Sequence, residues 1–194
     1  MFRGQIVIEQ FVGSLGRITA LLNKHNLEFA LIGGLASSIR GRVRVTADID
    51  IVVDCNVAKA IDFLEQLDEK VFRPFVEDPE LSIRQFFILP IEDVTSGIRI
   101  DMAIGESGFE KMIVQRASMP DGYSVPVATA EDLLLMKLMA GRPQDIGDVK
   151  GIVEQSRGLI DWSYCEKLAG LLDEVVQIDL LNSLERLKDE SERM

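Results

Sequence analysis

The segment Asp48-Ile49-Asp50-Ile51 places two carboxylates inside a run of β-branched residues. Such residues favour strands, and successive side chains of a strand point to opposite faces. Asp48 and Asp50 therefore share one face, about 6.6 Å apart along the backbone, while Ile49 and Ile51 share the other. The segment predicts a strand with one apolar face and one face that carries paired acids.

Two carboxylates on a partly buried face repel each other, and desolvation adds to the cost. A divalent cation removes this penalty, and oxygen ligands suit Mg²⁺, which usually keeps water and substrate phosphates in its shell. The alternative is a strand end at which Asp48 and Asp50 both reach solvent, since a D-x-D pattern is short and common.

The residues before this strand point to a phosphate ligand. Phe29 to Ile32 form a short apolar run, typical of a buried strand, which stops at Gly33-Gly34. Amides that follow such a turn into a helix start can face a phosphate. Thirteen residues separate Gly34 from Asp48, and three of them are basic: Arg40, Arg42 and Arg44. A solvated basic loop is the alternative, but the combination suits a metal-bound polyphosphate.

A third carboxylate lies in the segment Ile98-Arg99-Ile100-Asp101-Met102. Its apolar residues alternate, so Asp101 faces away from them. If this strand neighbours the one that carries Asp48 and Asp50, three carboxylates converge. Two could then hold metal ions, and the third could also accept a proton from an attacking hydroxyl. The alternative is a solvent-facing Asp101 paired with Arg99.

Composition narrows the function classes. The 194 residues include 21 Lys and Arg and 32 Asp and Glu, so the net charge is −11. This charge disfavours sequence-independent binding of nucleic acid over a broad surface but allows a local basic pocket. Two cysteines, Cys55 and Cys165, cannot form a disulfide framework. No P-loop or Rossmann glycine motif is present, and the lone His25, at the end of a helix, is expected to be structural. No apolar run reaches 18 residues and no signal peptide is recognisable, so we expect a cytoplasmic protein without a membrane partner.

Apolar periodicity predicts an α/β (α+β) fold, in which a mixed β-sheet is flanked by helices. The core is expected to span residues 1–128, and a helical C-terminal segment, residues 129–194, is expected to pack on it. The predicted strands cover residues 29–32, 49–53, 83–89, 97–104 and 123–127, with a turn over 90–96. The predicted helices of the core cover residues 8–26, 57–67 and 109–116.

The C-terminal segment shows clear helix signals. Thr129 and Asp132 stand at capping-box spacing before the helix over 133–139, and Gly141-Arg142-Pro143 ends that helix and starts the next. The next helix is expected to bury an apolar face of Ile146, Val149, Ile152 and Val153. Residues 162–187 predict one or two further helices, and residues 188–193 a solvated, fraying end.

The diglycine turn, the 13-residue gap and Asp48-Ile49-Asp50-Ile51 resemble the signature of the DNA-polymerase-β-like nucleotidyltransferase superfamily, with Asp101 as its third acid. Within the superfamily the chain is most similar to AbiEii-type nucleotidyltransferases, many of them toxins of toxin–antitoxin systems. Residues 44–50 resemble their R-x-[ST]-x-D-x-D segment. Their later Lys and R…D-x-x-D elements resemble Lys137, Arg142, Asp145 and Asp148. The resemblance covers about residues 28–155.

The resemblance implies transfer of a nucleoside monophosphate from an NTP such as ATP to a hydroxyl of a tRNA, a protein or a small molecule. It implies a two-metal magnesium site, or manganese in its place, and an antitoxin as a further partner. The implied catalytic residues are Asp48, Asp50, Asp101 and Lys137, and the three acids are also the implied metal ligands. The implied nucleotide-binding residues are Gly33, Gly34, Ser37, Arg44, Thr46, Lys137 and Arg142, of which Arg44 and Lys137 would neutralise the leaving pyrophosphate.

Two alternatives stay open at this stage. The first is a catalytically inactive domain of the same fold that binds a nucleotide or a partner. The second is a D-x-D glycosyltransferase, which would use Mn²⁺ and nucleotide-sugars and generally needs a longer chain. An intact acid triad favours the enzyme over the inactive domain.

Overall fold

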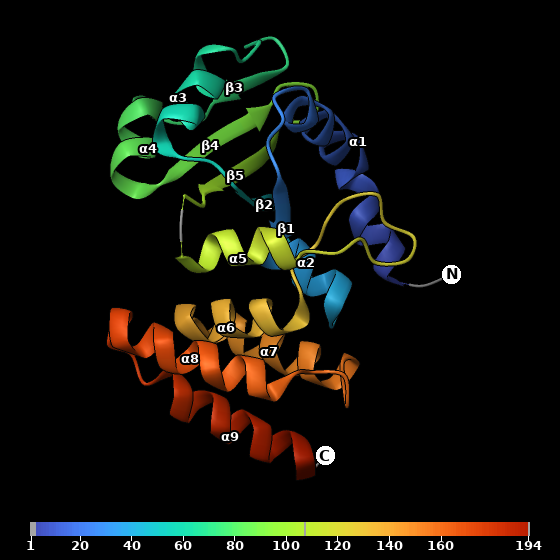
Figure 1. Cartoon of the computed structure of the whole chain (residues 1–194). Helices are drawn as coiled ribbons and strands as arrows, with labels where there is room; N and C mark the ends of the chain where they lie inside the picture. The colour runs from blue at the N-terminus through green and yellow to red at the C-terminus, as the bar shows by residue number, and fades with distance from the viewer. Residues whose placement is uncertain (1–2, 107, 194) are drawn as a thin grey trace. The chain divides into compact units, whose positions relative to one another are not determined.

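The computed structural model describes residues 3–106 and 108–193, and these form two compact units (Figure 1). The sheet unit comprises the chain through Ala36 and Arg44–Ala128. The helical unit comprises Ser37–Val43 and the chain from Thr129 onward.

The sheet unit contains a five-stranded mixed sheet in the order β1-β2-β5-β4-β3. Its strands are β1 (Phe29–Ile32), β2 (Asp48–Val53), β3 (Phe72–Pro74), β4 (Ile88–Asp93) and β5 (Ile98–Ile104). β2 and β5 run parallel, and every other neighbouring pair is antiparallel. The prediction of a mixed sheet flanked by helices is confirmed.

Side-chain alternation gives this sheet two different faces. Ile49, Ile51 and Ile100 are fully buried on one face. On the other face of the same strands, Asp48, Asp50 and Asp101 are only half-buried. Burial of the aliphatic face, at about 25 cal/mol per Å² of apolar surface, fixes which residues of β2 and β5 the opposite face presents.

Five helices belong wholly or partly to the sheet unit: α1 (Arg3–Lys24), α2 (Gly33–Arg40), α3 (Val57–Glu65), α4 (Pro79–Phe86) and α5 (Gly108–Arg116). α1 buries Phe11, Leu15, Ile18 and Leu22 at the predicted helical spacing. His25, just after α1, packs edge-on against Phe63 with 5.2 Å between ring centroids. The predictions for α1, α3 and α5 are confirmed.

The predicted strand over residues 83–89 is wrong, because most of this segment belongs to α4. The Asp78 side chain caps α4 by accepting a hydrogen bond from the Leu81 amide at 2.8 Å, and Pro79 occupies the first turn. The helix ends at Phe87, whose φ is 54°. The short apolar run alone could not separate a helix from a strand, whereas the cap does.

The predicted turn over residues 90–96 is also wrong, because β4 continues through Pro90 to Asp93. The Pro90 carbonyl accepts a hydrogen bond from the Phe75 amide at 2.9 Å, just beyond the end of the short strand β3. The amide and carbonyl of a strand residue point to the same side, so the N–H that proline lacks would also have faced Phe75. The missing N–H of Pro90 therefore removes no hydrogen bond between β4 and β5.

Residues 123–127 form no strand, contrary to the prediction. Val127 instead makes isolated bridges to Leu31 and Ser118. The Leu31 amide bonds the Pro126 carbonyl, and the Leu31 carbonyl accepts from the Ala128 amide. These two bonds continue the sheet beside β1 for too short a distance to count as a strand.

The helical unit contains α6 (Ala130–Ala140), α7 (Pro143–Gln155), α8 (Trp162–Val176) and α9 (Leu180–Arg193). Thr129 caps α6 through the Asp132 amide at 3.2 Å, and Gly141, with a φ of 60°, ends it. Pro143 starts α7, as predicted.

Two details of the helical unit differ from expectation. Ile146 is 57% exposed, so the apolar face of α7 consists of Val149, Ile152 and Val153 alone. α9 continues to Arg193 instead of fraying from residue 188, and Lys188 bonds Glu166 of α8 at 2.5 Å. Across the described residues of both units, no helix is long and apolar enough to span a membrane.

A buried carboxylate ties α1 to the turn between β4 and β5. Asp93 is completely buried and accepts hydrogen bonds from Arg17, Ser14, Ser96 and the Thr95 amide. Burial alone would raise the pKa of Asp93, but these hydrogen bonds together lower it to about 2. The charged form of Asp93 is therefore the form that stabilises this fold.

We expect the substitution Asp93→Asn to lower the free energy of unfolding at pH 7 by about 2 kcal/mol. The folded pKa lies below the unfolded value, so the stabilisation is present above about pH 4 and disappears as the pH falls toward 2. Urea unfolding of the wild type and the variant between pH 7 and 2.5 measures this difference. A difference that stays constant over this range would contradict the assignment.

Candidate functional site: three carboxylates at a diglycine turn

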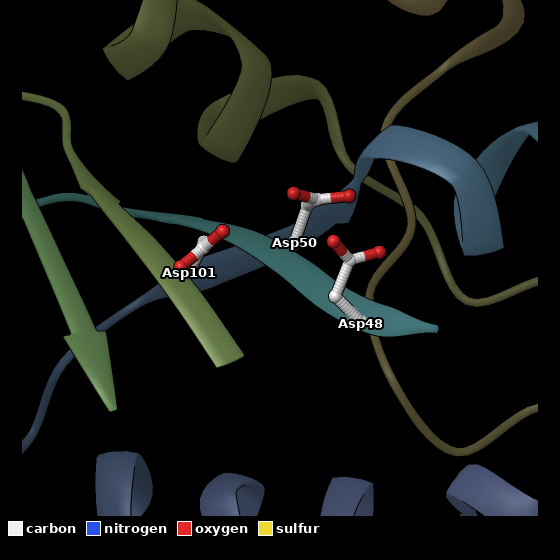
Figure 2. A group of neighbouring side chains, drawn as sticks. All are labelled: Asp48, Asp50 and Asp101. Atoms are coloured by element: carbon white, nitrogen blue, oxygen red, sulfur yellow. The ribbon is translucent and has the colours of Figure 1, made fainter. Parts of the chain in front are cut away.

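Three carboxylates converge where the centre of the sheet meets the start of α2. Asp48, Asp50 and Asp101 each offer an oxygen, and these oxygens all lie within 4.8 Å of one another. Asp50 and Asp101 are direct partners in the parallel β2–β5 pairing. Figure 2 shows Asp48 and Asp50 projecting from the same side of β2, with Asp101 beside them on β5. The structure thus brings together the three acids that the sequence singled out.

The diglycine turn provides the space that Asp50 occupies. Gly33 has a φ of 65°, and a Cβ atom there would lie 1.8 Å from Oδ2 of Asp50. The Gly34 amide donates to the same oxygen at 3.4 Å. A side chain at Gly33 would therefore be strained in its backbone and would also collide with the carboxylate.

Two further donors orient the other acids. The Thr46 hydroxyl donates to Oδ1 of Asp48 at 2.9 Å. Arg99 donates from Nε to Oδ1 of Asp101, also at 2.9 Å. Each bond fixes a rotamer of its carboxylate, as the supporting residues of metal ligands generally do.

The geometry fits a divalent cation. Carboxylate oxygens are the ligands that Mg²⁺ takes, and small side-chain rotations would bring oxygens within 4.8 Å of one another into one coordination shell. The same spacing suits two ions about 3.5–4 Å apart. Asp48, Asp50 and Asp101 are therefore the residues that would hold the metal.

Arg44 lies beside the turn, within the sheet unit. A Cβ atom at Gly34 would lie 2.6 Å from Nη2 of Arg44 and 2.9 Å from the hydroxyl of Thr46, so the absence of a side chain lets both approach the start of α2. Arg44 also donates from Nη1 to the Val45 carbonyl at 3.1 Å. Ser37, one turn later on α2, is buried.

The other two arginines of the basic segment belong to the helical unit. A Cβ atom at Gly151 of α7 would lie 2.7 Å from Cβ of Arg42, so this loop packs closely on α7. Arg40 is half-buried, and this desolvation lowers the pKa of its guanidinium, although the negative charge of Glu131 acts to raise it. The three arginines thus do not act as one solvated loop.

Lys137 and Arg142 belong to a separate, largely buried ion cluster within the helical unit. Lys137 Nζ lies 3.1 Å from Asp145 Oδ1 and 2.9 Å from Asp148 Oδ2. Arg142 donates from Nε to Asp145 Oδ2 at 2.7 Å. Burial would raise the pKa of Asp145, but its bonds to Arg142 and Lys137 lower it. These contacts join α6 to α7, and the role of Lys137 and Arg142 in nucleotide binding stays a prediction.

The sequence gives no signal for Phe75, an aromatic neighbour of Arg99. Phe75 is 52% exposed, and the guanidinium of Arg99 lies 5.1 Å from the centre of its ring. Phe75 follows β3, a three-residue strand too short to give a periodic signal. Its position relative to Asp101 depends on strand pairing, which no local pattern encodes.

We expect Gly33→Ala to lower the free energy of unfolding by about 2 kcal/mol or more, from left-handed backbone strain and the collision with Asp50. Gly16→Ala in α1 is the matched control, because a Cβ atom there meets nothing within 4 Å. It should leave stability unchanged or raise it by up to about 1 kcal/mol. Urea unfolding measures both variants, and equal stability for the two would contradict the tight contact at Gly33.

Comparison with known proteins supports this fold. Similarity to solved structures covers most of the chain at low sequence identity. An antigenic nucleotidyltransferase-like protein from Paracoccidioides brasiliensis is 15% identical, with a TM-score of 0.52 over 91% of this chain and 93% of that one. ANT(2″)-Ia in complex with adenylyl-2″-tobramycin is 16% identical, with a TM-score of 0.55 over 84% of this chain and 97% of that one.

A solution structure of ANT(2″)-Ia, described as an antibiotic-resistance factor, is likewise 16% identical, with a TM-score of 0.51 over 82% of this chain and 89% of that one. At these identities the likeness shows a shared fold. No curated protein matches the sequence. The model of a family described as "nucleotidyltransferase of unknown function (DUF6036)" matches residues 14–188, and the chain therefore belongs to this nucleotidyltransferase family.

Proposed function

We propose that the protein is an active, metal-dependent nucleotidyltransferase that moves a nucleoside monophosphate from an NTP to a hydroxyl acceptor. Family membership supports a transferase. The observation that carries the proposal is the convergence of Asp48, Asp50 and Asp101 beside Gly33 and Gly34. Three acids at one point favour an active enzyme over an inactive nucleotide-binding domain, because only the reaction requires all three.

The triphosphate would lie at the start of α2. Backbone amides at a helix N-terminus point outward and favour anions. Gly33 and Gly34 let the phosphates approach the backbone, and Ser37 would support the same turn. Arg44, beside Gly34, would neutralise charge that develops on the leaving pyrophosphate.

The three acids would divide the remaining tasks. Asp48 and Asp50 would hold both ions, and Asp101 would complete the site and accept the proton of the attacking hydroxyl. Two bound magnesium ions supply charge stabilisation to the attacking and leaving oxygens of such a displacement. The acceptor oxygen forms a bond to the α-phosphorus as the bond to the bridging oxygen breaks, and pyrophosphate leaves.

The acceptor is a hydroxyl of an RNA, a protein or a small molecule. The AbiEii-like segment Arg44–Asp50 supports a toxin that modifies tRNA or protein and is paired with an antitoxin. The likeness to ANT(2″)-Ia, whose structure contains adenylyl-2″-tobramycin, supports an aminoglycoside. In the proposal, the triad and the diglycine turn serve the same reaction whichever acceptor binds.

Substitution of the acids tests the reaction. Incubation with α-labelled NTPs, Mg²⁺ and total tRNA, cell protein or tobramycin should label one acceptor. Asp48→Asn and Asp101→Asn should each reduce the transfer at least about 100-fold, since each removes a carboxylate ligand of the metal ions that would neutralise the phosphate charge. Asp62→Asn, on the exposed side of α3, is the control and should retain wild-type transfer. Metal-dependent NTP binding without transfer to any acceptor would favour the inactive domain instead.

Metal binding can be measured apart from turnover. We expect MgCl₂ to stabilise the wild type against thermal unfolding, by about 2.7 kcal/mol at 100 times its dissociation constant, and EDTA to reverse the effect. Asp50→Asn should abolish this shift, whereas Asp62→Asn should retain it. Equal magnesium shifts in the two variants would exclude the triad as the metal site.

A further inference from the structure

Two acids of the triad begin a row of residues that crosses β2, β5 and β4 on a single face of the sheet and ends at Phe75, just after β3. Asp50 pairs with Asp101, Asp101 pairs with Pro90, and the Pro90 carbonyl bonds the Phe75 amide. Neighbouring strands lie about 4.8 Å apart, so Phe75 stands about 10 Å from Asp101 across the sheet. Pro90, between them, is buried.

A second row runs beside the first. It consists of Asp48, Arg99, Glu92 and Arg73, paired in that order. Arg73 binds Glu92 through two hydrogen bonds of 2.9 and 2.8 Å, and its side chain is 57% exposed. The two rows together bring exposed arginines next to an exposed aromatic ring.

Arg99 links Phe75 to the triad. Its Nε bonds Asp101 at 2.9 Å, and its guanidinium lies 5.1 Å from the Phe75 ring centre. Its side chain is 45% exposed. The bond to Asp101 and the contact with Phe75 restrain the guanidinium, so the pair forms a fixed platform: an aromatic ring, a guanidinium and, beyond them, the acids.

The order of the strands places this platform on the side of β2 away from the diglycine turn. The diglycine turn follows β1, on one side of β2, whereas Arg99, Pro90 and Phe75 lie on β5, β4 and after β3, on the other side. In a phosphoryl or nucleotidyl transfer, the attacking and leaving groups stand in line on opposite sides of the phosphorus. If the pyrophosphate leaves toward the turn, the acceptor arrives over the platform.

We propose that Phe75 and Arg99 bind an unpaired base of a single-stranded RNA end whose terminal hydroxyl is the acceptor; this rests on the proposed nucleotidyl transfer. Unpaired RNA bases stack on aromatic rings and on arginine guanidiniums, and arginines contact the phosphates. Arg73, in the adjacent row, binds Glu92 through Nε and Nη2, and its Nη1 would contact such a phosphate.

Direct RNA binding tests the platform without turnover. The probe is a fluorescein-labelled single-stranded 12-nucleotide RNA with a free 3′ hydroxyl, and its Kd is measured by anisotropy in Mg²⁺ without NTP. Phe75→Ala should weaken binding at least about fivefold, the lower end for the loss of one stacked base, and Phe75→Tyr should restore it to within about twofold. Phe86→Ala is the matched control, since Phe86 at the end of α4 is even more exposed, at 70%. Equal affinities for Phe75→Ala and Phe86→Ala would overturn the proposal.

Transfer assays separate the other outcomes. With labelled ATP, Phe75→Ala should raise the KM for the RNA and not the KM for ATP. A raised KM for ATP alone would mean that Phe75 holds the base of the NTP, which overturns the acceptor assignment. Labelling of tobramycin or of a hydroxyl-bearing peptide but not of the RNA would overturn it too, while leaving the nucleotidyl transfer intact. No transfer to any acceptor would reject the proposed function, and the anisotropy result would still decide whether the platform binds RNA.

Discussion

Mutual repulsion among three carboxylates is the constraint that shapes this protein. Oxygens within 4.8 Å of one another repel by about 3 kcal/mol for each pair at an effective dielectric constant of about 20, and by less where solvent screens them. The chain opposes this repulsion on the other face of the same strands, where Ile49, Ile51 and Ile100 are fully buried and fix the register of β2 against β5. Burial of apolar side chains therefore provides the free energy that holds the three carboxylates together. A bound cation would replace their repulsion by attraction to the ion.

The residues around the acids oppose the same repulsion by holding each carboxylate in place. Gly33 and Gly34 bring the start of α2 against Asp50, and Thr46 and Arg99 hold the other two carboxylates by hydrogen bonds of 2.9 Å. Farther away, the buried Asp93 fastens α1 to the β4–β5 turn by charged hydrogen bonds of its own. Rigid support on strands and a helix start, rather than on mobile loops, suits a reaction that depends on positioning.

Local chemistry explains which parts could be predicted from the sequence. The alternation in β2 and β5 and the caps at Thr129 and Gly141 are encoded within a few residues, so those elements were predicted correctly. Residues 83–93 were not, because a short apolar run fits a helix or a strand and Pro90 suggests a turn until its neighbour Phe75 is known. The sequence could not predict that β2 and β5 are neighbours. About fifty residues separate Asp50 from Asp101, and pairing over that distance has no local signature. For the same reason the sequence did not predict a role for Phe75. It also did not predict the contacts of Lys137 with Asp145 and Asp148.

Crystals of the protein grown with Mn²⁺ and a non-hydrolysable ATP analogue would show whether the three carboxylates hold a metal beside a bound triphosphate. Anomalous scattering locates manganese independently of the protein coordinates. We expect manganese bound by oxygens of Asp48, Asp50 and Asp101, with the phosphates of the analogue against the amides of Gly33 and Gly34. Manganese bound elsewhere, or an analogue whose phosphates avoid the diglycine turn, would contradict it.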